Sequence, residues 1–150
     1  ASKYFEIKVI CAGSKGEIAI KKLIQYHENV DYIGKIPRSG IDNFFSQIDV
    51  LAIPSVSEGF GIVQLEAMAR GIPVISSNRT GEAVIDGVNG IKIKAGDVDG
   101  LAEALSRLAG NREELEQMSS AALERIKDFS PEKMVSHWKT IITDYENNMI

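Results

Sequence analysis

The chain has 150 residues, with 17 Lys and Arg against 21 Asp and Glu, so its formal charge is −4. Hydrophobic residues make up 44% of it and charged residues 25%, which is typical of one soluble globular domain and leaves little room for a second. The mild acidity gives no electrostatic reason to expect nucleic acid, no apolar stretch approaches the ~20 residues of a membrane span, and the single cysteine, Cys11, excludes an internal disulfide framework.

Short apolar runs alternate with segments of helical period through the first two thirds of the chain. Strands are predicted at residues 5–11, 30–33, 50–53, 72–76 and 90–94. Helices are predicted at residues 17–26, 41–47 and 62–70, the last closed by Gly71, and a helical turn at residues 82–85. Five strands with helices between them predict an α/β fold, with a parallel sheet of about five strands covered by helices on both faces.

The last third of the chain has a helical pattern. Asp97 is the predicted cap of a helix at residues 98–108, and Asn111 with Glu114 resembles a capping box for a helix that reaches about residue 127. A Ser-Pro pair at residues 130–131 starts the final helix. Apolar residues form one stripe on it at helical spacing: Met134, Trp138, Ile141, Ile142 and Tyr145. We expect this stripe to pack in the core, and the alternative is a docking surface for a missing domain.

One loop at the expected ligand-binding edge of the sheet stands out by its composition. Ligands of an open parallel sheet bind beyond the carboxyl ends of the strands. Residues 54–61 leave a buried strand there and enter a helix through Gly59 and Gly61, which let the backbone approach a ligand closely and adopt a positive φ. The free N–H groups of Phe60, Gly61 and Ile62 would then point out of a helix N-terminus, where a phosphate binds readily.

Two carboxylates frame this loop, Glu58 before the glycines and Glu66 inside the helix, with seven residues between them. Glu66 lies roughly one and a half turns into the helix and should point back toward its N-terminal opening. A carboxylate there can accept both hydrogens of a vicinal diol such as ribose, and Glu58 can accept from sugar hydroxyls. The alternative is that both are solvated surface residues, although Glu66 has apolar neighbours and would need a partner. Spacing alone leaves both interpretations open.

Other residues near this edge carry weaker signals. Residues 12–16 have some likeness to a nucleophile elbow or a phosphate loop but match neither pattern, so a tight turn is favoured. His27 and His137 are isolated, without metal-ligand spacing, and we interpret both as surface or packing residues. Arg79 can face a phosphate or solvent, and nothing in the sequence decides between the two.

The beginning of the chain also carries an expectation. It opens at Ala1-Ser2-Lys3, without an initiator Met or a signal-peptide core, and enters a strand-like run within a few residues. We therefore expect a piece of a longer protein. The single cysteine favours a reduced, cytoplasmic setting, with peripheral attachment to the inner face of the membrane as an alternative for the full-length protein.

The residues around this loop resemble a known family. Residues 55–71 (SVSEGFGIVQLEAMARG) followed by residues 72–76 (IPVIS) look very like the core signature of the group 1 nucleotide-sugar glycosyltransferases. Further matches run through nearly the whole chain: residues 29–34 (NVDYIG), 49–55 (DVLAIPS), 82–90 (EAVIDGVNG) and the helix at residues 97–108. These are retaining enzymes of the GT-B architecture, in which two Rossmann-like domains face each other across a cleft. The resemblance implies that residues 1–150 are the C-terminal donor-binding domain, a Rossmann-like half of a GT-B fold, without the N-terminal acceptor domain and the first strand–helix unit.

The resemblance also implies a role for each residue of the loop. The family's Glu-x7-Glu motif falls on Glu58 and Glu66. Glu58 would be the catalytic residue that holds hydroxyls of the donor sugar, and Glu66 would bind the nucleotide ribose. The backbone of the intervening turn would lie against the sugar and the diphosphate, a donor-binding set of Gly59, Phe60, Gly61 and Ile62. Lys35 and Ile36 would contact the base through their backbones.

The chain departs from the family pattern at residues 79–82 (RTGE), which are shorter than the usual double-glycine loop, so a backbone contact there and any role of Arg79 are in doubt. Relatives begin this domain with one more strand and helix, carrying an Arg and a Lys that neutralise the donor diphosphate. We therefore expect this chain to bind donor nucleotide weakly and to transfer no sugar by itself. No metal or cofactor is expected, because pre-aimed amides and cations can stabilise the leaving diphosphate. The expected partners are a nucleotide-diphosphate sugar and, through the missing domain, a glycan or lipid-linked acceptor.

Other functions fit the pattern less well. A receiver-like signalling domain needs an acidic pair after its first strand and an Asp ending the third, where this chain has Cys11-Ala12-Gly13 and Pro54-Ser55. A sugar-nucleotide epimerase or phosphorylase of the same architecture is a closer alternative. The Glu58 and Glu66 pair favours a transferase over the epimerase, and a phosphorylase would be a much longer chain. A nucleotide-binding module that transfers no sugar is the remaining alternative.

Overall fold

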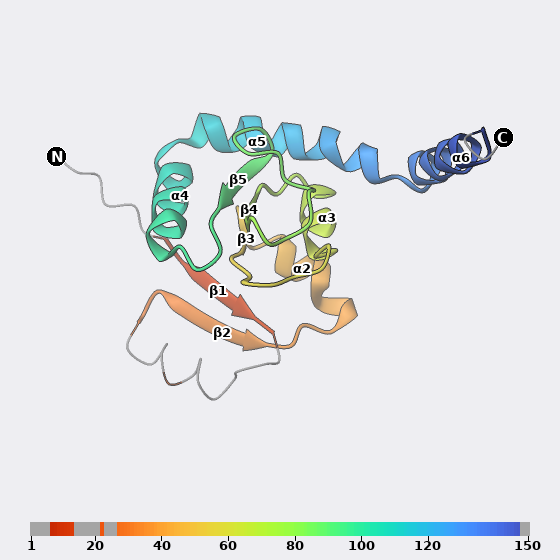
Figure 1. Ribbon diagram of the computed structural model, residues 1–150. Coiled ribbons are helices and arrows are strands. Elements are labelled where there is room, and N and C mark those ends of the chain that lie inside the picture. The colour runs from red at the N-terminus through yellow and green to blue at the C-terminus, as the bar shows by residue number, and fades with distance from the viewer. Residues whose placement is uncertain (1–6, 14–21, 23–26, 148–150) are drawn as a thin grey trace.

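The computed structural model describes residues 7–13, 22 and 27–147 of the chain. Within these residues five strands, all paired in parallel, alternate with loops and helices (Figure 1). They are β1 (Val9–Ala12), β2 (Val30–Gly34), β3 (Leu51–Ile53), β4 (Val74–Ser77) and β5 (Gly90–Ile93). This confirms the α/β class and the parallel pairing expected from the sequence.

Hydrogen bonding divides the strands into a pair, β1–β2, and a group of three, β3–β4–β5, with β4 in the middle. In the larger group Leu51 stands opposite Val74, and Val74 stands opposite Gly90. A Cβ on Gly90 would lie 2.1 Å from the carbonyl oxygen of Val74, so only glycine fits at this point of the ladder. The described strands therefore form two hydrogen-bonded groups rather than one continuous ladder.

The core lies on both sides of β4. Val74 and Ile75 are fully buried and, as neighbours on one strand, point to opposite faces of the sheet. One face is covered by α2 (Ile41–Phe45), α3 (Val63–Met68), the loops before and after β4, and the second half of α5 (Arg112–Arg125). The buried side chains on this face are Phe45, Ala67, Met68, Ile72, Ala83, Val84 and Ala122. The other face is covered by α4 (Val98–Gly110) and the first half of α5, through Ala104, Leu108, Leu115 and Met118.

Most of the expected boundaries are confirmed to within a few residues. β1 begins at Val9 rather than at residue 5, and residues 5–6 lie outside the described residues, as does all of the helix expected at residues 17–26 except Lys22. A short 3₁₀ helix, η1 (Arg38–Gly40), precedes α2. α3 closes at Gly71, as expected: its φ is +68°, and the N–H groups of Gly71 and Ile72 donate to the carbonyls of Met68 and Ala67, the two bonds of a Schellman motif.

The caps of α4 and α5 are the ones that the sequence predicts. The carboxylate of Asp97 accepts the N–H of Gly100 at 2.8 Å. Asn111 Oδ1 accepts the N–H of Glu114 at 3.1 Å, and the carboxylate of Glu114 accepts from Asn111 Nδ2 at 3.2 Å. A capping box would use the backbone N–H of the cap residue for the second bond, so this reciprocal pair uses the side-chain amide instead.

Residues 82–85 do not form the predicted helical turn. Asn89, which is fully buried, takes up the backbone groups of this segment. Its Oδ1 accepts the N–H of Ile85 at 2.7 Å, and its Nδ2 donates to the carbonyl of Ala83 at 3.3 Å. A side chain that bonds nearby backbone groups competes with helix formation, and for this reason the prediction is wrong here.

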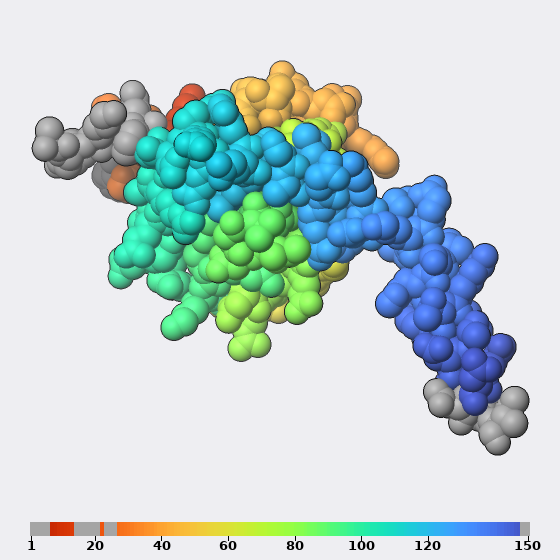
Figure 2. All heavy atoms as spheres, turned by 90° about the horizontal axis from the view of Figure 1, so that it is seen from above, coloured from red at the N-terminus to blue at the C-terminus, as the bar shows by residue number. Residues whose placement is uncertain are grey.

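The last helix, α6 (Pro131–Asn147), follows the 3₁₀ helix η2 (Ile126–Phe129) and extends away from the body of the chain (Figures 1 and 2). It starts where expected, with Ser130 Oγ accepting the N–H of Lys133 at 3.3 Å. None of its residues is buried, and its apolar stripe is exposed, with Trp138 at 60%. The expectation that this stripe packs in the core is therefore wrong for the described chain. Apolar residues at helical spacing indicate that one face of the helix packs against another surface, but they do not indicate which surface.

Candidate functional site

The loops that leave β3, β4 and β5 are joined at the carboxyl edge of the sheet. Ser77 Oγ, at the end of β4, donates to the carbonyl of Ser55, just beyond β3. The N–H of Asn78 donates to the carbonyl of Ile93 at 2.9 Å, and Asn78 Oδ1 accepts the N–H of Ala95 at 3.1 Å. Because these bonds link the segments that follow β3, β4 and β5, the edge where a ligand was expected is a connected surface.

Residues 58–62, which the sequence predicts to bind the donor and which we call the donor turn for that expectation, lie on this edge between β3 and α3. Gly61 has a φ of +68°, as predicted, whereas Gly59 is not in the left-handed region. Within the described part of the chain, the N–H groups of Phe60, Gly61 and Ile62 donate to no acceptor. α3 itself has only six residues, shorter than the helix predicted at residues 62–70, so an anion here would be bound chiefly by the turn amides and little by a helix dipole.

Neighbouring segments hold the donor turn in place. Gln64 is fully buried, and its Nε2 donates to the carbonyl of Phe60 at 2.6 Å. The loop after β4 adds two backbone bonds, from the N–H of Glu58 to the carbonyl of Arg79 at 3.3 Å and from the N–H of Gly81 to the carbonyl of Gly59 at 3.2 Å. Sequence reasoning missed Gln64, although an amide among apolar helix neighbours was a usable signal.

The two carboxylates of the motif have different surroundings. Glu58 is exposed, and its Oε1 accepts the N–H of Gly59 at 3.2 Å. Glu66 is half-buried, and its carboxylate has no hydrogen bond or salt bridge within the described residues. A half-buried carboxylate without a partner is costly unless a ligand or water satisfies it. Its surroundings therefore favour a binding role for Glu66 over a solvated surface position.

Lys35 and Ile36 directly follow β2, which pairs with β1 and precedes the group β3–β4–β5 in the sequence. Lys35 is exposed and Ile36 half-buried. The exits of β1 and β2 are tied together, because the N–H of Gly13 donates to the carbonyl of Gly34 at 2.8 Å. No hydrogen bond in the described chain joins residues 35–36 to the donor turn.

The remaining sequence candidates are on the surface. Arg79 is exposed and acts through its backbone: its carbonyl accepts from Glu58, and its N–H donates to Ser77 Oγ at 3.2 Å. His27 and His137 are exposed, as expected. Residues 14–16 of the first loop lie outside the described residues. Nowhere in the described part do three His, Cys, Asp or Glu side chains form a group that could hold a metal ion.

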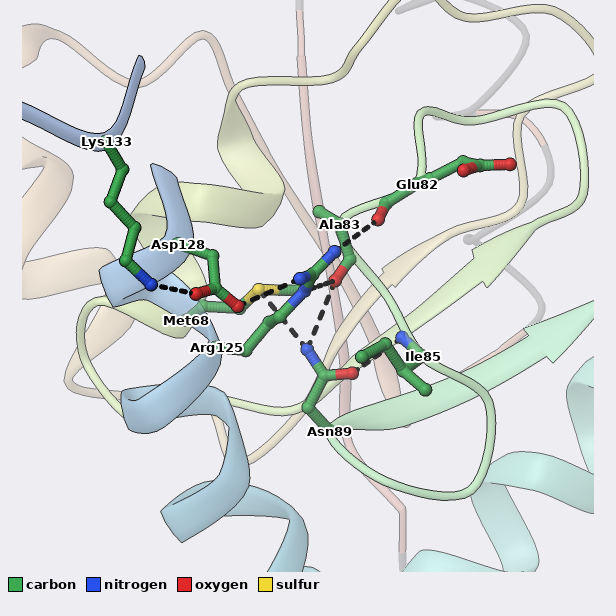
Figure 3. A network of polar contacts seen from close by, with 8 residues as sticks. All are labelled: Met68, Glu82, Ala83, Ile85, Asn89, Arg125, Asp128 and Lys133. Carbon is green, nitrogen blue, oxygen red and sulfur yellow. Dashed lines mark hydrogen bonds and ion pairs between the residues drawn. The ribbon is translucent and has the colours of Figure 1, made fainter. Parts of the chain in front are cut away.

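A polar network that joins the loop after β4 to the end of α5 and the start of α6 was not expected from the sequence (Figure 3). Arg125, the last residue of α5, donates to the carbonyls of Glu82 and Ala83 at 3.1 and 3.2 Å and to the carboxylate of Asp128 at 2.9 Å. Lys133, in the first turn of α6, also bonds Asp128. The bonds from Lys133 and Arg125 lower the pKa of Asp128 below its ordinary value.

A separate hollow of about 370 Å³ lies near the opposite ends of β3 and β4, between α2 and α5. Its two guanidinium groups already have acidic partners: Arg70 bonds Asp42, and Arg112 bonds Asp49 and Glu116. It is remote from the donor turn, and we assign it no ligand.

None of the described helices is long and apolar enough to cross a membrane.

Known proteins resemble this chain in sequence and in fold. The family model described as glycosyl transferases group 1 matches residues 2–125. A curated relative, the D-inositol 3-phosphate glycosyltransferase of Kribbella flavida, is 37% identical over 100 residues, which are 65% of this chain and 24% of that protein.

Two solved structures are similar in fold. HepE of Anabaena, solved in complex with UDP, shares 25% identity at a TM-score of 0.73, covering 94% of this chain and 41% of that one. The C-terminal domain of LpcC from Francisella tularensis, a glycosyl transferase group 1 family protein, has a TM-score of 0.68 at 20% identity, covering 74% of this chain and 60% of that one. The chain thus spans about a quarter of the Kribbella relative and about two fifths of HepE.

Proposed function

The chain belongs to the group 1 glycosyl transferases, and on that premise we propose that it supplies the donor-binding half of a retaining glycosyltransferase. The observation that carries the proposal is the donor turn itself. Three consecutive N–H groups without an acceptor in the described chain, at Phe60, Gly61 and Ile62, are followed by the half-buried carboxylate of Glu66. Amides suit a diphosphate and a carboxylate suits the ribose diol, so the two together match a nucleoside diphosphate.

The sugar end of the donor would lie beside Glu58. Its carboxylate is exposed at the start of the turn, where it can accept from sugar hydroxyls once it leaves the N–H of Gly59. Lys35 and Ile36 would contact the base through their backbones. This assigns Glu58 the catalytic role beside the sugar and assigns Glu66 the role of binding the ribose of the nucleotide.

Cleavage of the donor places negative charge on the leaving diphosphate and an oxocarbenium-like charge on the sugar. Amides that are already aimed at the diphosphate stabilise the first charge without reorganising during the reaction. We propose that these amides, together with cations of the full-length protein, carry this role without a metal ion. Activity that persists in EDTA is the test, and loss of activity restored by Mg²⁺ would contradict it.

The donor is proposed to be a nucleotide-diphosphate sugar, and UDP is the first nucleotide to try. HepE has been solved with UDP and with UDP-glucose, which supports this choice of nucleotide. A glycan or lipid-linked acceptor would be held by an N-terminal domain, and we propose a cytoplasmic location for the whole enzyme. The exposed stripe on α6 would then dock on that domain.

The 150-residue chain should bind UDP with a dissociation constant in the high micromolar to millimolar range, about −4 to −6 kcal/mol. It should transfer no sugar, because without the acceptor half water is not excluded and no second substrate is positioned. Titration with UDP followed by NMR, and assay of nucleoside diphosphate release with mixed acceptors, test both statements. Acceptor-dependent turnover by this chain alone would overturn the assignment as a donor half.

A further inference from the structure

Arg125 connects the end of α5 to the loop that borders the donor turn. Its guanidinium bonds through all three nitrogens: Nε to the carbonyl of Ala83, one terminal nitrogen to the carbonyl of Glu82, and the other to the carboxylate of Asp128 (Figure 3). The two carbonyls lie more than 40 residues away in the sequence, with separations of 42 and 43. A planar guanidinium fixes two neighbouring acceptors in a way that a lysine ammonium does not.

The loop that Arg125 holds is fixed from its other side as well. The carbonyl of Ala83 also accepts from Asn89 Nδ2 at 3.3 Å, and Ala83 and Asn89 are both fully buried. The N–H of Ala83 donates to the carbonyl of Gly81 at 3.0 Å. Residues 81–83 therefore have little freedom to move relative to α5.

Phe60, in the middle of the donor turn, is held between two parts of this assembly. On one side Gly81 approaches so closely that a Cβ there would lie 2.9 Å from both the Cα and the carbonyl oxygen of Phe60. On the other side the ring of Phe129, in η2, lies 5.6 Å from the ring of Phe60, centroid to centroid. The guanidinium carbon of Arg125 is 4.8 Å from the centroid of the Phe129 ring. Arg125 thus contacts the Phe129 ring directly, and it holds Glu82 and Ala83, the two residues that follow Gly81.

We propose that Arg125 is a positioning residue for donor binding: with Phe129 it forms a strut that sets the position of Phe60, and hence the direction of the unpaired turn amides, without touching the donor. The inference deepens the proposed function, because it assumes that those amides bind the donor diphosphate. It also assigns the 3₁₀ helix η2 a role beyond connecting α5 to α6.

A purely structural role makes a different prediction. Arg125 also bonds Asp128 within η2, and that contact alone could stabilise the end of α5. Lysine in place of Arg125 can keep the ion pair with Asp128 but cannot hold two carbonyls in the same fork. If the Asp128 contact were the important one, Arg125→Lys would behave like the unchanged chain, whereas the strut requires that it behave like Arg125→Met.

The test compares Arg125→Lys, Arg125→Met and Phe129→Leu in the 150-residue chain. The matched control is Arg112→Met, at the other end of the same helix, because the exposed guanidinium of Arg112 pairs, among the residues that the structure describes, only with Asp49 and Glu116. Hydrogen exchange is measured without ligand at the hydrogen-bonded amides of Glu58 and Gly81. The strut predicts about tenfold faster exchange at these amides in the three variants, with no change in β4 and α4 and none in the control.

The second readout is the affinity for UDP, measured by NMR at low temperature, where every variant remains folded. We expect the dissociation constant to rise about tenfold in all three variants and to stay the same in Arg112→Met. Unchanged protection of Glu58 and Gly81 together with unchanged affinity would overturn the strut, as would full rescue by lysine. If the unaltered chain bound no UDP, the proposed function would fail, while the exchange data would still decide whether Arg125 holds the turn. Phe129→Leu keeps the test available if a substitution of Arg125 prevents folding.

Discussion

Replacement of Gly81 by alanine should displace the donor turn, because the added Cβ would lie 2.9 Å from the Cα and the carbonyl oxygen of Phe60. Ordinary contacts of a Cβ begin near 3.4 Å, so one of the two segments must move by 3.4 − 2.9, or about 0.5 Å. Overpacking of this kind costs typically ~1–3 kcal/mol. For a chain of this length the melting temperature should fall by roughly 2–12 °C. The affinity for UDP should fall about tenfold, because hydrogen bonds to a charged group are worth ~1.5–3 kcal/mol each.

Gly40→Ala is the control for this prediction. Its φ is −99°, and a Cβ there would meet its nearest atoms, in Ile36 and Pro37, at 3.5 Å, which is an ordinary contact. That variant should be as stable as the unaltered chain or more stable by up to about 1 kcal/mol. Thermal melts of both variants and UDP titrations of Gly81→Ala check the reasoning. If Gly81→Ala had the same melting temperature and the same affinity for UDP as the unaltered chain, the close approach of Gly81 to Phe60 would be refuted.

Three further substitutions test the site and its support. Glu66→Ala should weaken UDP binding by ~1.5–3 kcal/mol with the fold intact, as measured by NMR titration. Glu103→Ala, which removes an exposed acid on α4, should leave the affinity unchanged. Equal affinities of the two variants would refute the ribose assignment. Glu58→Ala in the full-length enzyme should lower kcat far more than it weakens binding of bare UDP, and a parallel loss in both would contradict its place at the sugar. Asn89→Ala should lower the free energy of unfolding by about 1–3 kcal/mol, because the N–H of Ile85 loses its buried acceptor; an unchanged urea midpoint would show that this bond adds nothing.

Features that depend on local sequence were predictable. Asp97, Asn111 and Gly71 cap helices as expected because a cap needs only a suitable side chain or a positive φ at one position. The strands were found from apolar runs, and their parallel pairing follows from the helices and loops between them. The motif at residues 58–66 was located in the same way, since its glycines and carboxylates are consecutive or nearly so, and its role in donor binding stays a prediction.

Features that depend on distant partners were not predictable. In place of the helical turn expected at residues 82–85, backbone groups of this segment form hydrogen bonds with the side-chain amide of Asn89. Nothing in the sequence pattern indicates which side chain will form these bonds. The stripe on α6 has the period of a buried face and is exposed along the described helix. Arg125 carries no motif, because its partners are main-chain carbonyls whose residue types do not matter.

Gly61, within the donor turn, and Gly81, which lies against it, illustrate why a binding loop is easier to recognise than its support. Gly61 is required by its own backbone, since its φ of +68° is unfavourable for other residues, and such a requirement belongs to one position in a recognisable motif. Gly81 has no positive φ and is required only because Phe60 lies against it. Amides stabilise a developing charge best when they are held in position before the reaction. The supports at Gly81, Gln64 and Arg125 should therefore matter for catalysis as much as the turn does, although only the turn has a sequence signature.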